Sequence, residues 1–187
     1  MRSPDVECIK SKSNNALFCI FATVTIVQHL SDAPRVVGDN RHMLIQPSQA
    51  DVRRFFCGVY AKARSGAPLE AMELLVSQWI DEHREYHAAL SDVDAALRDM
   101  AKADPNAENP FLHLSMHLSI SEQCSIDQPR GIRQAVELLT HRLNSLHDAH
   151  HQTMECLGRM VFESQRSGRV PDGQAYIDCV QRHATRD

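Results

Sequence analysis

Hydrophobic and polar positions follow a helical period along most of the chain after residue 45. Apolar residues recur three and four positions apart in several segments, and residues common at helix ends separate these segments. No stretch after Met43 shows the sustained alternation of a strand. The pattern therefore predicts an all-α protein, an antiparallel helical bundle of about five to six helices with short connections.

Residues typical of helix ends place the expected helices. Ser48 with Asp51 resembles a capping box, and the helix that it opens is expected to end at Ser65-Gly66. Pro68 and Asn109-Pro110 are expected to open two more helices, because proline is tolerated in the first helical turn. The later helices are expected to begin at Asp127-Gln128-Pro129, near Leu146 and at Pro171-Asp172.

The chain before this pattern has a different character. We expect residues 1–45 to be a poorly ordered N-terminal extension and residues 46–187 to be the helical domain. An apolar run over residues 16–27 is shorter than the roughly 20 residues of a membrane-spanning helix. It could be the core of a signal peptide, since positive charges precede it and Ser31-Asp32-Ala33 resembles a cleavage site. Pro34 would follow the cut, which weakens that interpretation.

Composition narrows the classes of partner. The 187 residues include 20 Lys and Arg against 24 Asp and Glu, a formal charge of −4, and no basic run occurs. Nucleic-acid affinity comes largely from clustered Lys and Arg, so we expect no nucleic-acid partner. We also expect no membrane partner. An unknown small molecule or protein stays open as a partner, as does the oligomeric state.

The cysteines favour a reducing compartment. Six cysteines are spread along the chain without a C-x-x-C pair, which excludes a thioredoxin-like motif and a zinc knuckle. A domain of this length can build a core without disulfides. We therefore expect buried free thiols and a cytoplasmic protein. The cysteines are Cys8, Cys19, Cys57, Cys124, Cys156 and Cys179.

The histidines, 11 in the chain, are the main candidates for a functional site. Six of them form three pairs four residues apart, and such pairs share one face of a helix. The last pair continues by a further step of four to a glutamate. In helix bundles, side chains from facing helices build internal metal sites in this way. The candidate ligands are His83, His87, His113, His117, His147, His151 and Glu155.

Imidazole nitrogens with a carboxylate suit transition metals, and we expect Fe or Zn, as one or two ions. If the site is catalytic, the ion would polarise a substrate or activate water; if it is redox-active, two irons bridged by Glu155 would be the natural arrangement. The alternative is a non-enzymatic interaction or scaffold protein with structural histidines. Whether the protein is an enzyme stays open. We expect His141, His150 and His183 on solvated faces, and His29 and His42 lie in the extension.

Several segments resemble a family of small bacterial proteins known as domain of unknown function 1841. They include Gln49-Ala50-Asp51-Val52-Arg53-Arg54-Phe55-Phe56, Asn109-Pro110-Phe111-Leu112-His113-Leu114-Ser115-Met116-His117-Leu118 and Met154-Glu155-Cys156-Leu157-Gly158. The resemblance implies a domain from about Met43 onward, and an over-extended start for residues 1–42. Similar members often have proline after the histidine that corresponds to His83, where this chain has Arg84. Whether His83 and His87 share one helix therefore stays open.

The histidine spacing is also loosely similar to hemerythrin-like and DinB-like bundles, which hold metal with histidines four residues apart. That likeness concerns architecture alone. Hemerythrin-like sites use a five-residue step from histidine to aspartate in the last helix, whereas here His147, His151 and Glu155 follow in steps of four. The likeness therefore implies no oxygen carriage.

Overall fold

The computed structural model describes residues 48–99 and 108–185, and the regular structure of these residues is entirely helical. This confirms the all-α prediction, and six of the helices have twelve residues or more. The predicted extension over residues 1–45 lies outside the described residues. The helices are α2 (Gln49–Ser65), α3 (Ala71–Glu82), the 3₁₀-helix η1 (Arg84–Tyr86), α4 (His87–Leu90), α5 (Val93–Asp99), α6 (Pro110–Ile126), α7 (Ile132–Leu143), α8 (Leu146–Ser167) and α9 (Gly173–Thr185).

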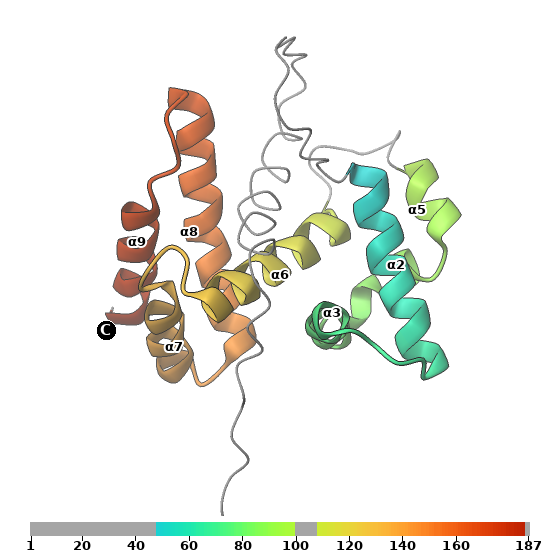
Figure 1. Cartoon of the computed structure of the whole chain (residues 1–187). Helices are drawn as coiled ribbons and strands as arrows, with labels where there is room; N and C mark the ends of the chain where they lie inside the picture. Colours follow the sequence, from blue (N-terminus) through green and yellow to red (C-terminus); the bar gives the residue numbers. More distant parts are fainter. Residues whose placement is uncertain (1–47, 100–107, 186–187) are drawn as a thin grey trace, which may run out of the picture.

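Helix α6 lies between two groups of helices (Figure 1). On one side, α2 to α5 enclose an apolar core to which α6 contributes Leu114 and Leu118. On the other side, α7, α8 and α9 enclose a second core to which α6 contributes Ile120. The face of α6 between these cores is therefore buried without being wholly apolar, and the candidate ligands of this helix lie there.

Helix ends agree with the sequence where side chains form the caps. Ser48 and Asp51 make the predicted reciprocal capping box at α2. The carboxamide oxygen of Asn109 accepts hydrogen bonds from the backbone N–H groups of Phe111 and Leu112 at the start of α6. Each cap satisfies N–H groups that have no partner within the helix. The cap at Asn109 fixes where the first turn of α6 begins.

Two predicted helix starts are wrong by three residues. Helix α3 begins at Ala71 rather than Pro68, because the backbone N–H of Glu70 donates to the side chain of Glu73 and Glu70 becomes the N-cap. Helix α7 begins at Ile132 rather than Pro129. The carboxylate of Asp127 accepts from the N–H of Gly131 at 2.9 Å, and this side-chain bond holds the preceding residues in a turn. The short helices α4 and α5 were not predicted.

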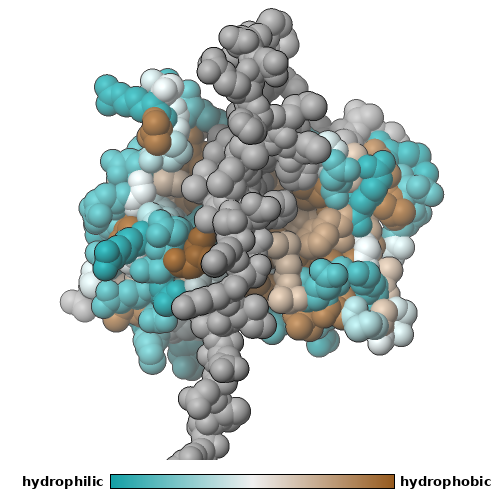
Figure 2. Space-filling model, viewed as in Figure 1, coloured by the Kyte–Doolittle hydropathy of each residue, from teal (hydrophilic) through white to brown (hydrophobic). Residues whose placement is uncertain are grey.

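Figure 2 shows hydrophilic side chains around the outer edge of the molecule and an apolar area beside the grey trace, on the side of α2 and α3. Phe162 of α8 and Val170, in the connection between α8 and α9, are the most exposed of the large apolar residues described, at 62% and 88%. Among the described helices, none combines the length and the apolar character that a membrane crossing requires.

Two of the cysteines form a disulfide, which corrects the expectation of free thiols at these positions. Cys156 of α8 is bonded to Cys179 of α9, with 5.8 Å between their Cα atoms. The two residues are 23 positions apart, and only the packing of α8 against α9 brings them together. Cys57 and Cys124 are free, as expected.

Candidate metal centre

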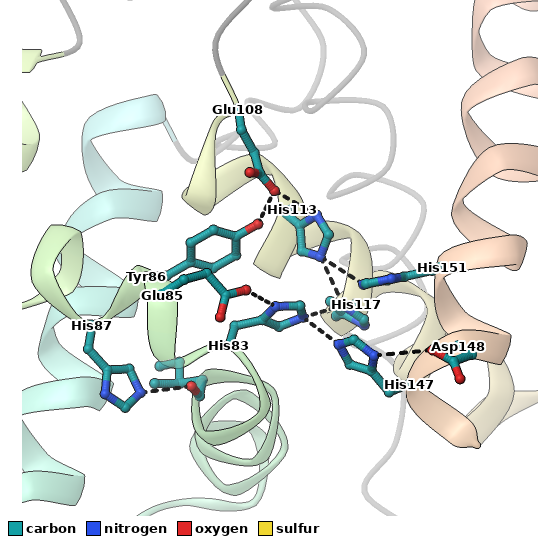
Figure 3. A network of polar contacts seen from close by, with 11 residues as sticks. His83, Glu85, Tyr86, His87, Glu108, His113, His117, His147, Asp148 and His151 are labelled. Atoms are coloured by element: carbon teal, nitrogen blue, oxygen red, sulfur yellow. Dashed lines mark hydrogen bonds and ion pairs between the residues drawn. The ribbon is translucent and has the colours of Figure 1, made fainter. Parts of the chain in front are cut away.

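His83 lies at the C-terminal end of α3. It is the C-cap of α3, with φ −115° and ψ 65°, so the chain leaves the helical path before η1 begins. Its side chain is buried, and 2% of the residue is exposed. His87 consequently does not share a helix face with His83. The Nε2 atom of His87 lies 3.0 Å from the carbonyl oxygen of Ile80, away from the other histidines (Figure 3).

Helix α6 supplies two histidines one turn apart. His113 and His117 lie in the half of the helix that follows the Asn109 cap. His117 is fully buried, and its ring stacks on Trp79 of α3 with 4.1 Å between ring centroids. His113 is half-buried and lies nearer the surface. The cap and the packing of α3 on α6 therefore aim both imidazoles at the end of α3.

Helix α8 supplies two histidines from its first two turns. The hydroxyl of Ser145 accepts from the N–H of Asp148 and caps the helix. His147 and His151 follow on one face, half-buried, and α8 packs against α6. The three predicted pairs thus contribute five histidines to one place.

The Nε2 atoms of these five imidazoles meet in a chain of short contacts (Figure 3). For His83, His117, His147 and His151, one ring nitrogen each lies within 4.8 Å of those of the other three. His113 joins them through His117 and His151. The Nε2 separations are 2.8 Å for His83 and His117, 3.3 Å for His83 and His147, 3.2 Å for His113 and His117, and 3.1 Å for His113 and His151.

These separations match those of nitrogens on one metal ion. A metal–nitrogen bond is about 2.0–2.1 Å long, which places two ligand nitrogens roughly 2.9–3.4 Å apart, depending on the coordination angle. The observed Nε2 contacts of 2.8 to 3.3 Å fall in or just below that range. Neighbouring imidazoles therefore have the spacing of ligands on one ion, and the group could hold a metal ion.

Three of the imidazoles have a carboxylate beside Nδ1, on the side away from the cluster. The pairs are His83 with Glu85 at 2.8 Å, His147 with Asp148 at 3.7 Å and His113 with Glu108 at 4.0 Å. A carboxylate there favours the tautomer with its proton on Nδ1, which leaves a lone pair on Nε2. The Nε2 atoms of His83 and His147 then face each other with two lone pairs, an arrangement that a cation between them stabilises.

Burial favours the neutral form of His113, His117 and His151. Desolvation, followed by the nearby His83 and His151, lowers the pKa of His113 to about 4. Desolvation, followed by the nearby His150, lowers the pKa of His117 far below its ordinary range. The pKa of His151 is lowered as well, chiefly by burial and then by His147. Neutral imidazoles are the form that binds metal.

Comparison with known proteins places the chain in a family. The sequence model of a family described as a domain of unknown function, DUF1841, matches residues 48–182. The chain belongs to the DUF1841 family. The match confirms the resemblance seen in the sequence, and it includes all seven predicted ligands. No curated protein and no solved structure matches the chain.

Within this DUF1841 chain, two predicted ligands lie outside the cluster. Glu155 is exposed on α8, two turns beyond His147. A step of four residues is slightly longer than one helical turn of 3.6 residues, so two steps rotate the position by about 80° around the helix and carry Glu155 off the buried face. His87 is separated by the break at His83.

His150 is a buried neighbour of the cluster, which corrects the expectation of a solvated face. It is 2% exposed, and its Nδ1 lies 3.3 Å from Nδ1 of His117. Burial, followed by His151 and His147, lowers the pKa of His150 to about 3. Residues 147, 150, 151 and 154 follow the spacing of a buried helix face. That spacing was the signal that could have found His150.

Aromatic side chains close the cluster on two sides. Trp79 stacks on His117 and donates a hydrogen bond to the hydroxyl of Ser121 at 2.8 Å. Tyr86 stacks on His83, with 5.1 Å between ring centroids, and its hydroxyl donates to Glu108. These contacts limit rotation of the imidazoles, which pre-organises their nitrogens for a ligand.

Proposed function

We propose that this DUF1841 protein binds a transition-metal ion, Fe or Zn, in the histidine cluster. The observation that carries the proposal is the convergence of ring nitrogens from α3, α6 and α8. His83, His117, His147 and His151 are the main ligands, and His113 is the fifth. Imidazole nitrogens are common ligands of these metals, and no carboxylate is needed among the direct ligands.

One ion fits this arrangement better than two. The Nε2 atoms form one continuous chain of contacts, and Glu155, which would have bridged two irons, is exposed. The acidic groups of Glu85, Glu108 and Asp148 instead lie behind the imidazoles. Their negative charges favour a cation in the cluster without occupying a coordination position.

Among the described residues, the cluster reaches the surface at His113 and His147. The side chains of His113 and His147 are 21% and 30% exposed, whereas His83 and His117 form the buried side. An accessible position is what separates a catalytic metal site from a structural one. When bound there, an ion would polarise a substrate or activate water. This supports metal-dependent catalysis as the use of the site.

Metal analysis of protein made without a histidine tag tests the proposal. After incubation with Fe²⁺ without oxygen, or with Zn²⁺, and removal of free ions, we expect about one tightly bound ion per chain. His117→Ala and His151→Ala should lose that ion. His141→Ala is the matched control, because His141 is exposed on α7, and it should bind like the unchanged protein.

The outcome separates the proposal from the scaffold alternative. Less than about a tenth of an equivalent of any transition metal, together with a melting temperature that chelator does not change, would show that the histidines are structural. Equal metal content in His117→Ala and His141→Ala would overturn the assignment of these ligands. Circular dichroism of each variant shows that loss of metal is not loss of fold.

A further inference from the structure

A second group of ligand-type side chains joins α8 to α9. Each helix contributes two residues four positions apart, Gln152 and Cys156 from α8 and Cys179 and His183 from α9. The two cysteines are bonded as a disulfide, and Nδ1 of His183 lies 3.2 Å from the side-chain oxygen of Gln152. The four side chains therefore form two facing pairs in the same helix interface.

Three of these side chains have the ligand atoms of a zinc site. The two Sγ atoms and one ring nitrogen of His183 lie within 4.8 Å of one another. Two thiolates, one imidazole and one further ligand are a known tetrahedral set for Zn²⁺. The oxygen of Gln152, already beside His183, or a water molecule can be the fourth ligand.

The surroundings favour a metal when the disulfide is reduced. Cys156 and Cys179 are 1% and 4% exposed and lie in the second apolar core. A thiolate in such a place has no water to solvate it, so it requires a cation. When the S–S bond is reduced, the two sulfurs move apart to a non-bonded contact. Two sulfurs bound to one Zn²⁺, with Zn–S bonds of about 2.3 Å, lie roughly 3.8 Å apart, which is similar to that non-bonded distance.

We propose that α8 and α9 are cross-linked in both redox states, by the disulfide when oxidised and by Zn²⁺ when reduced. A dithiol reductant gives two electrons and two protons to the disulfide and itself becomes a disulfide, which leaves two cysteine thiols. Zn²⁺ then binds both sulfurs as thiolates and releases two protons. This site is independent of the histidine cluster, and it would keep α9 in place in a cytoplasm as well as in an oxidising compartment.

Cobalt substitution tests the site in the full-length chain. The protein is reduced with a phosphine, freed of reductant without oxygen and titrated with Zn²⁺ or Co²⁺, beside oxidised protein. We expect the reduced protein to bind one more ion per chain. The Co²⁺ form should show thiolate-to-metal charge-transfer absorption in the near ultraviolet, which a site of imidazoles alone cannot produce.

Variants separate this site from the histidine cluster. Cys156→Ser with Cys179→Ser should lose the extra ion and the absorption, and His183→Gln should weaken Zn²⁺ binding by at least about tenfold. His141→Gln is the control for His183, because it is exposed on the neighbouring α7. Equal Zn²⁺ binding by reduced and oxidised protein would overturn the proposal. So would loss of helical circular dichroism on reduction that Zn²⁺ does not restore.

Discussion

At the scale of single residues, the partner of each imidazole decides which nitrogen faces the cluster. The carboxylate of Glu85 accepts from Nδ1 of His83 at 2.8 Å, although its own side chain is 60% exposed. The hydrogen bond to His83, followed by a backbone hydrogen bond, lowers the pKa of Glu85. Glu85 is therefore ionised at neutral pH and orients His83 with its Nε2 lone pair inward.

Glu85→Gln should weaken metal binding about 10–100-fold. The amide keeps the size of the side chain but loses the charge that favours a proton on Nδ1 of His83. Competition with a chromophoric chelator measures the change in affinity. Glu82→Gln is the matched control, because Glu82 is exposed at the end of α3. An unchanged affinity in Glu85→Gln would show that Glu85 does not orient the ligand.

The sequence identified most of the cluster at this scale and missed what depends on tertiary packing. Histidines four apart on α6 and α8 were found because spacing alone puts them on one face. The sequence does not determine the direction of the chain at His83, because that direction depends on where α3 ends. His150 was misplaced because polar neighbours near it in sequence suggested solvent, whereas Trp79 covers it, with 4.3 Å between the ring centroids.

At the scale of elements, α6 depends on its first turn. Its two ligands follow directly after a cap in which Asn109 accepts two backbone N–H groups. Pro110 fits the first helical position, since it has no N–H to satisfy. A frayed first turn would move His113 before His117, because His113 lies closer to the end of the helix.

Asn109→Ala should lower the free energy of unfolding of the metal-free protein by about 0.5–2 kcal/mol. The alanine leaves the N–H groups of Phe111 and Leu112 without their side-chain acceptor. Urea unfolding followed by circular dichroism measures the loss. Asn109→Asp, which retains a good capping side chain, should change the stability far less. Equal losses in both variants would show that Asn109 acts through something other than the cap.

Elements were predictable where the signal is local. The capping box at Ser48, the cap at Asn109 and the left-handed glycines at positions 66 and 168 are properties of a few consecutive residues. The starts of α3 and α7 depend instead on which backbone N–H group the carboxylates of Glu73 and Asp127 accept from. The disulfide needed the packing of two helices, which no local pattern contains.

At the scale of the whole molecule, the buried histidines make stability depend on pH. Their pKa values in the folded protein, about 4 for His113 and about 3 for His150, lie below the value near 6.5 of an unfolded chain. Below pH 6.5 the unfolded chain therefore binds protons that the folded chain does not bind. The stability that these histidines contribute is fully present above pH 6.5 and is lost as the pH falls toward 4.

The free energy of unfolding of chelator-treated protein should fall by at least about 1 kcal/mol per pH unit between pH 6 and pH 5. Carboxylates with lowered pKa values add their loss mainly below this window. Urea unfolding at several pH values measures the slope, and His150→Gln should reduce it. A stability that stays constant from pH 7 to pH 5 would contradict the burial of neutral histidines.

The position of α6 has a mechanical consequence for the molecule. Leu114 and Ile120, less than two turns apart, belong to different cores. The two groups of helices therefore pack on one continuous helix. Neither group can move away from α6 without losing core contacts with it. A cation held by His113 and His117 would stabilise α6. Its binding would therefore stabilise both groups of helices as one cooperative unit.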